Sequence, residues 1–111
     1  MTGEVRNRYM RLILFFDLPV ETAAQRKAYR TFRKFLIKDG YLQLQESVYA
    51  KLVLNDGAAA GAIARLRKNR PSQGLVQVLK VHESQFATME YITGNRKAYD
   101  EVDTMEELLV L

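Results

Sequence analysis

The stretch Tyr9-Met-Arg-Leu-Ile-Leu-Phe-Phe-Asp17 decides how this chain folds, because its side chains alternate with the period of a β-strand. One face is wholly apolar and consists of Met10, Leu12, Leu14 and Phe16. The other face is mixed and consists of Arg11, Ile13, Phe15 and Asp17. Pro19 ends the strand, since proline has no N–H to donate to a neighbouring strand. We therefore predict a strand over residues 9–17 that is partly buried on both faces.

An amphipathic helix is predicted next, from Thr22 to Asp39. Thr22 and Gln25 have the spacing of a capping box, in which each side chain accepts a hydrogen bond from the other residue's backbone N–H. Gly40 is well placed to adopt the left-handed conformation that ends many helices. The apolar stripe of this helix consists of Ala24, Ala28, Phe32, Phe35 and Leu36.

A second helix is predicted from a cap at Asp56 to about Arg70. Its apolar residues recur at helical spacing and are Ala59, Ala62, Ile63 and Leu66. The last turn is rich in cations, which are favourable beside the negative end of the helix dipole. Pro71 prevents the helix from continuing.

The other elements are strands and short segments. Tyr41–Gln45 and Val48–Leu54 are predicted to form a hairpin with a turn near Glu46–Ser47, and Leu75–Val81 is a fourth strand that is apolar on both faces. Three shorter pieces complete the chain: a helix from its cap Ser84 to about Tyr91, a loop over Gly94–Tyr99, and a short final strand over Glu107–Leu111.

The order strand, helix, strand, strand, helix, strand is the ferredoxin-like split βαβ arrangement. The predicted fold class is therefore α+β, with a ferredoxin-like βαββαβ core over residues 1–92. Residues 93–111 form a C-terminal loop and terminal strand that docks onto its own or a partner subunit. Two helices cover only one face of a four-stranded sheet. Because the second face is also apolar, the simplest cover is another copy of the chain, and we predict a symmetric homodimer.

The composition fits one globular domain. The chain has 111 residues, of which 48% are hydrophobic and 27% are charged. Its longest apolar run, Leu12–Phe16, is far shorter than the roughly 20 residues that a membrane span needs. The first residues are polar where a secretory signal would be apolar. The absence of cysteine excludes disulfides and zinc–thiolate sites. We expect a cytoplasmic protein that has no membrane contact.

The charge of the chain is unevenly distributed. All 17 Lys and Arg lie in residues 1–99, beside only eight Asp and Glu, although the net charge of the whole chain is only +4. A basic body of this kind favours a polyanionic partner, of which nucleic acid is the commonest. A basic surface that merely keeps the protein soluble is the alternative. The five remaining acids lie in the last twelve residues and are Asp100, Glu101, Asp103, Glu106 and Glu107.

Two groups of cations are candidates for nucleic-acid binding. The first group lies on the first helix and consists of Arg26, Lys27, Arg30, Arg33 and Lys34. The second lies at the end of the second helix and consists of Arg65, Arg67, Lys68 and Arg70. Both could simply be solvated helix faces. Contact with phosphates is the functional interpretation, and recognition of a duplex backbone is favoured because the tyrosines lack the spacing of a base-stacking platform.

Asp17 is the residue best placed for chemistry, because a carboxylate at the end of an apolar strand needs solvent, a hydrogen-bond donor or a cation. One interpretation is that it caps the turn into the helix. The other is a Mg²⁺ ligand, since Mg²⁺ often takes only one or two protein carboxylates and completes its shell with water and phosphate. A two-fold dimer could bring two copies of Asp17 together. His82 is the only histidine, and a lone histidine at the end of a strand is usually a surface or hydrogen-bonded residue.

Four segments together resemble a known family. They are Met10-Arg-Leu-Ile-Leu-Phe-Phe-Asp-Leu-Pro19, Arg26-Lys-Ala-Tyr-Arg-Thr-Phe-Arg-Lys-Phe-Leu36, Gln45-Glu-Ser-Val-Tyr49 and Glu83-Ser-Gln-Phe-Ala-Thr-Met89. In combination they resemble the CRISPR-associated family Cas two, the small subunit of the spacer-acquisition machinery, in its type II form. The similarity covers about residues 9–92.

The resemblance implies a ferredoxin-like homodimer that lies between two dimers of the integrase subunit, Cas one. There it would help to capture a short duplex of foreign DNA for insertion into the CRISPR array. Family members are also described as metal-dependent endonucleases, with the aspartate of the first strand as Mg²⁺ ligand. That role implies Asp17 as the catalytic and metal-binding residue, with one Mg²⁺ site shared across the dimer.

The sequence therefore leaves three hypotheses for the function. The first is a DNA-binding scaffold in spacer acquisition. The second is a Mg²⁺-dependent endonuclease, acting on DNA or RNA through Asp17. The third is a ferredoxin-like interaction dimer that binds no nucleic acid. The family motifs argue most strongly against the third.

Overall fold

Four strands form one antiparallel sheet in the order β2-β3-β1-β4. The computed structural model describes residues 9–94. Its elements are β1 (Met10–Asp17), α2 (Ala23–Lys38), β2 (Leu42–Gln45), β3 (Val48–Val53), α3 (Asp56–Lys68), β4 (Leu75–His82) and α4 (Glu83–Phe86). The predicted βαββαβ order and the α+β ferredoxin-like class are confirmed. The predicted segments Gly94–Tyr99 and Glu107–Leu111 lie wholly or largely outside the described residues.

Strand β1 is a central strand, paired with β3 along one edge and with β4 along the other. One of its faces packs against α2 and α3, and Ile13 on the other face packs against Phe86 of α4. Leu14 is opposite Tyr49 on β3 and Val78 on β4. The hairpin of β2 and β3 turns at Glu46–Ser47 as predicted, with a register shift between Gln43 and Gln45. Strands β2 and β4 are the two edges of the sheet.

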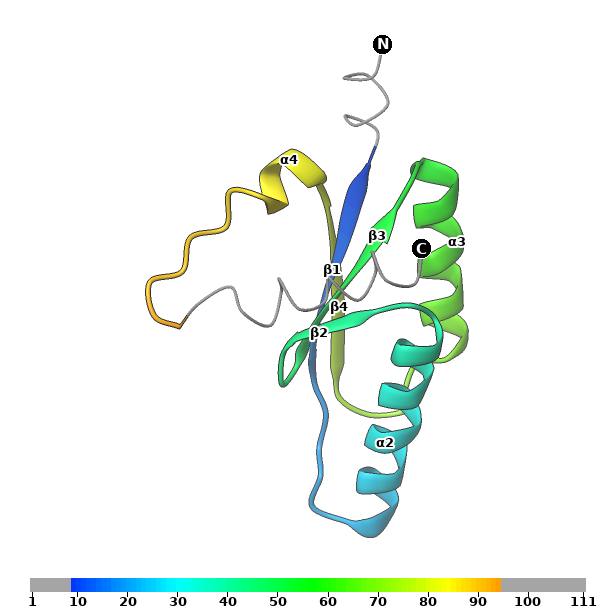
Figure 1. Ribbon diagram of the computed structural model, residues 1–111. Helices are drawn as coiled ribbons and strands as arrows, with labels where there is room; N and C mark the ends of the chain where they lie inside the picture. The colour runs from blue at the N-terminus through cyan, green and yellow to red at the C-terminus, as the bar shows by residue number, and fades with distance from the viewer. Residues whose placement is uncertain (1–8, 95–111) are drawn as a thin grey trace.

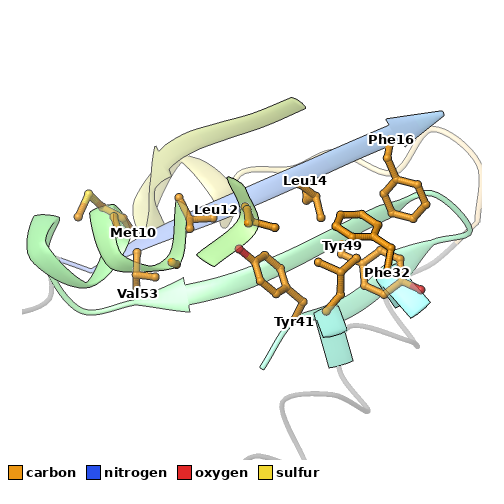
Figure 2. Packing of buried hydrophobic residues seen from close by; sticks show 12 residues of the cluster. Met10, Leu12, Leu14, Phe16, Phe32, Tyr41, Tyr49 and Val53 are labelled. Atoms are coloured by element: carbon orange, nitrogen blue, oxygen red, sulfur yellow. The ribbon is translucent and has the colours of Figure 1, made fainter. Parts of the chain in front are cut away.

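The main core lies between one face of the sheet and the helices α2 and α3, which cover that same face (Figure 1). Leu12, Leu14 and Tyr49 on the sheet are fully buried. The helices contribute Phe32 and Leu36 from α2, and Ala59, Ala62 and Leu66 from α3. Figure 2 shows Phe16, Phe32 and Tyr49 gathered at one end of this core, where the rings of Phe16 and Phe32 meet edge to face.

Local signals define both ends of α2. The capping box of Thr22 and Gln25 forms, with the Gln25 N–H donating to Thr22 Oγ1 at 3.1 Å. Gly40 has a φ of 97°, so the chain turns away from the helix where a left-handed residue was predicted. The predicted apolar stripe is confirmed at its centre, where Phe32 and Leu36 are buried, whereas Ala24 is exposed.

The predicted caps of the other two helices are wrong by one or two residues. The side chain of Asn55, rather than that of Asp56, caps α3, because Asn55 Oδ1 accepts the Ala58 N–H at 2.7 Å. Helix α4 begins after His82, so Ser84 lies within it. It also ends at Phe86 instead of continuing to Tyr91, and the chain turns directly afterwards.

The second face of the sheet is only partly covered. Helix α4 lies on this side (Figure 1), and its Phe86 packs with Ile13 and Ala50 into a small second cluster. A groove of about 510 Å³ remains beside the cluster, lined by residues that include Phe15, Leu44, Val48 and Met89. Large apolar side chains stay exposed here, with exposed fractions of 39% for Phe15 and 53% for Leu79. The predicted apolar second face is therefore present.

Within residues 9–94, no helix combines the length and the apolar character required to cross a bilayer.

Candidate nucleic-acid interface

Helix α2 carries many cations and no acid along its 16 residues. Five of them are predicted from the sequence to contact phosphates, and all five have exposed side chains: Arg26, Lys27, Arg30, Arg33 and Lys34. Lys38, in the last turn of the helix, is exposed as well and was not among the predicted residues. Its spacing of four from Lys34 could have identified it, because positions i and i+4 are neighbours on a helix.

Two of the α2 arginines contact the protein itself. Arg26 Nη1 donates to the backbone oxygens of Val20 and Glu21, at 3.2 and 2.9 Å, and so holds the connection that leads into the helix. Arg33 Nε donates to Tyr49 Oη at 3.1 Å. Because Tyr49 is fully buried, Arg33 provides its hydroxyl with a partner and has a structural role whatever else it binds.

The cations of α3 have more varied surroundings. Arg65 forms an ion pair with Asp39 at 2.8 Å, which ties α3 to the end of α2. Arg67 and Arg70 line a small groove whose apolar floor includes Leu66 and Val78. The fourth, Lys68, is exposed at the last position of the helix.

Asp17 lies at the end of β1, on the same face of the sheet as Phe15. Its carboxylate is exposed and forms no hydrogen bond or ion pair within residues 9–94, so it does not cap the turn into α2. The backbone nearby is tightly packed. Gly74, with a φ of 94°, lies so close that a Cβ atom there would be 2.7 Å from the Asp17 carbonyl oxygen.

The residues around Asp17 provide few ligands for a metal ion within one chain. No cluster of three or more His, Cys, Asp or Glu side chains occurs in the part of the chain that the structure describes. One exposed carboxylate fits Mg²⁺ only if further oxygen ligands come from water, phosphate or a second chain. Asp17 is on the partly uncovered face of the sheet. A second copy of the chain packed against that face would therefore bring its own Asp17 to the same surface.

A partly buried ion pair on the second face was not predicted from the sequence. Arg11 is only 5% exposed, and its Nε and Nη2 atoms donate to Glu83 at 2.6 and 3.1 Å. The guanidinium carbon also lies 4.8 Å from the centre of the Phe86 ring. The position of Arg11 among apolar residues of β1 was the signal in the sequence that could have indicated an ion pair. The pair holds α4 against β1, whereas His82, at the start of α4, is exposed as expected.

The chain is similar to known proteins of the CRISPR-associated Cas2 family. The family model for CRISPR associated protein Cas2 matches residues 10–89. A CRISPR-associated endoribonuclease Cas2 from Streptococcus mutans is 53% identical over 87 residues, covering 78% of this chain and 80% of its own length. One from Treponema denticola is 49% identical over 102 residues, covering 92% and 100%. Another, from Ligilactobacillus salivarius, is 42% identical over 87 residues, covering 78% and 86%.

Proposed function

The chain belongs to the CRISPR-associated Cas2 family, and we propose that it serves spacer acquisition as a homodimeric scaffold that binds a short DNA duplex. The observation that carries this proposal is the acid-free helix α2, whose cations all have exposed side chains. Together with the cations at the end of α3, they offer contacts for phosphates without any base-reading group. Binding of this kind suits a protein that must accept DNA of any sequence.

The homodimer is supported by the second face of the sheet. Phe15, Leu75 and Leu79 are exposed on strands whose opposite face is the main core. An apolar surface of this kind on a small domain is typical of a contact with another protein. A second copy covers it by two-fold symmetry, since the same patch then serves both subunits.

Residues 93–111 are proposed to dock at the edge of the sheet. Strand β4 is an edge, so its outer backbone groups can accept a further strand from the same or the partner subunit. The groove beside β4 has Arg67 and Arg70 at its border. This arrangement complements a segment that is acidic and then apolar, as residues 100–111 are.

Spacer acquisition also requires a partner that joins DNA strands, and we propose the family's integrase subunit for that position. The test is integration of a labelled short duplex into a CRISPR-array plasmid by the cognate integrase, with and without this protein. Stimulation by the wild-type protein, and equal stimulation by Asp17→Ala, supports a scaffold whose carboxylate is dispensable. No stimulation by the wild-type protein contradicts the proposal and favours a nuclease or a dimer that binds no nucleic acid.

A second candidate function is a Mg²⁺-dependent endonuclease, favoured by the exposed Asp17 and by the names of the relatives. In a dimer, two Asp17 carboxylates would hold one Mg²⁺, which when bound neutralises charge on the phosphate that is cut. Cleavage of labelled RNA and DNA should then require divalent metal and disappear in Asp17→Asn. Cleavage that survives this substitution shows that Asp17 is not the site.

A further inference from the structure

Four cations on α2 form a single row along the outer side of the helix. They are Lys27, Arg30, Lys34 and Lys38. At 100° per residue they fall within about 80° of the helix circumference, and they span about 16 Å of its length. Phe32 and Leu36, which face the core, lie on the other side of the helix. All four cations are exposed.

None of these four forms a hydrogen bond or an ion pair with any other part of residues 9–94. The neighbouring arginines differ in this respect. Arg26 is bonded to two backbone oxygens, Arg33 to the buried Tyr49, and Arg65 to Asp39. These three would have to give up or share an internal contact in order to bind a phosphate, whereas the four cations of the row would not.

The row also has a cost that an ordinary solvated helix face avoids. Like charges at i and i+4, such as Arg30 with Lys34 and Lys34 with Lys38, destabilise a helix by about 0.2 to 0.5 kcal/mol per pair. Soluble surfaces usually mix both signs of charge, but α2 contains no acid. The cations at the end of α3 need no such explanation, because Arg65, Arg67 and Lys68 lie in its last turn, where the helix dipole favours them. Lys38 benefits from the dipole of α2 in the same way, but Lys27, Arg30 and Lys34 lie before the last turn.

From these observations we infer that the row of Lys27, Arg30, Lys34 and Lys38 is the principal phosphate-contact line of this protein. The inference rests on the proposed function and narrows it to particular residues. With about 3.4 Å of duplex axis per nucleotide on each strand, a row of this length spans about five nucleotides of one backbone. The ligand class is the phosphate backbone of nucleic acid, bound without sequence preference because the row carries no aromatic or amide side chain.

The test compares two triple variants that remove the same charge. Lys27→Gln with Arg30→Gln and Lys34→Gln removes cations of the row, whereas Arg26→Gln with Arg33→Gln and Arg65→Gln removes the internally bonded arginines. Binding of a labelled DNA duplex is followed by fluorescence anisotropy while salt is raised from about 50 to 200 mM. The row variant should reduce the steepness of log K against log salt by about 2.7 for each subunit whose row contacts the duplex, which is 0.9 for each contact. The second variant should reduce it less.

Further variants guard against effects of folding and of net charge. Arg67→Gln with Lys68→Gln and Arg70→Gln provides a second comparison if the internally bonded triple fails to fold, and it too should reduce the slope less than the row variant. Lys38→Gln should weaken binding, whereas Lys80→Gln, an exposed lysine outside the row, should leave it unchanged. Lys34→Gln should weaken duplex binding, whereas Lys34→Arg should bind as the wild-type protein does, because it keeps the positive charge.

Each possible result decides between the hypotheses. A wild-type protein that binds no duplex at all contradicts the proposed function, and the inference with it. The wild-type protein could instead bind the duplex, with a salt slope that falls equally in the row variant and the comparison variants, or falls more in a comparison variant. That result would contradict the assignment of the row but not the proposed function.

Discussion

Arg11 shows how one charged residue can be retained on an apolar strand. It is the only charged side chain in the buried class among the described residues, and Glu83 accepts two hydrogen bonds from its guanidinium group. Hydrogen bonds to charged groups contribute about 1.5 to 3 kcal/mol each where they are buried, although Glu83 is 29% exposed and its share is therefore reduced.

We predict that Glu83→Gln lowers the free energy of unfolding by about 1 to 3 kcal/mol, because the carboxylate that balances a buried guanidinium is lost. Urea denaturation followed by circular dichroism measures this change. Lys80→Gln is the matched control: it breaks the exposed ion pair with Asp56, which should cost less than about 0.5 kcal/mol. Equal effects of the two changes would show that burial of Arg11 has no energetic consequence.

Tyr41 makes stability depend on pH in the alkaline range. Burial is the main cause, and the nearby Asp39 charge adds to it, so that the pKa of Tyr41 rises from 10.0 to about 12. The folded state therefore holds the phenolic proton more tightly than the unfolded state. The stability that this provides is complete below pH 10 and is lost as the pH rises from 10 towards 12.

We predict that the wild-type protein loses about 2 kcal/mol more stability than Tyr41→Phe between pH 9 and pH 12, at about 1.4 kcal/mol per pKa unit. Below pH 9, Tyr41→Phe should be as stable as wild type or more so, because the hydroxyl of Tyr41 is buried without a hydrogen-bond partner among the described residues. Thermal melts across this pH range provide the measurement. Parallel losses in both proteins would contradict the assignment to Tyr41.

At the scale of elements, the loop between α3 and β4 packs closely against the end of β1. Gly74 has a positive φ, and a Cβ atom there would lie 2.7 Å from both the Asp17 carbonyl oxygen and a methyl carbon of Leu18. A backbone atom cannot move aside as a flexible side chain can. The loop can therefore pack against the end of β1 only because residue 74 is glycine.

We predict that Gly74→Ala destabilises the protein by more than about 1 kcal/mol and shifts the backbone at Asp17. Gly61→Ala, within α3, is the control: a Cβ atom there meets its nearest atom at 3.5 Å, and the change should be neutral or stabilise by up to about 1 kcal/mol. Chemical denaturation and amide chemical shifts near Asp17 report the two effects. A neutral Gly74→Ala would show that the loop adjusts freely.

Much of this level of structure could be predicted from the sequence, because the deciding signals are local. The alternation in β1, the pairing of Thr22 with Gln25, and Gly40 all act within a few residues. The cap of α3 was placed wrongly because Asn55 and Asp56 are both good caps and only the geometry selects one. The contacts of Arg11 with Glu83, and of Arg33 with Tyr49, join residues far apart in the chain, and no periodicity encodes such pairs.

At the scale of the whole molecule, the proposed homodimer and its shared Mg²⁺ site depend on a sheet face that one chain leaves only partly covered. Phe15, Leu79 and Asp17 share the second face of the sheet. Helix α2, which carries the row of cations, lies on the other side of the sheet (Figure 1). Two copies joined through the second face would therefore leave both α2 rows accessible to nucleic acid. They would also bring the two Asp17 side chains to the same interface.

Sedimentation velocity of the wild-type protein and of Phe15→Glu tests this homodimer most directly. Phe15 is 39% exposed, so a charge at this position should disrupt a contact between chains without emptying the core. Ile37→Glu, at an apolar residue on α2 that is 53% exposed, is the control. We predict a dimer for the wild-type protein and Ile37→Glu, and a folded monomer for Phe15→Glu. A monomeric wild-type protein, or a Phe15→Glu variant that remains dimeric, would contradict the account.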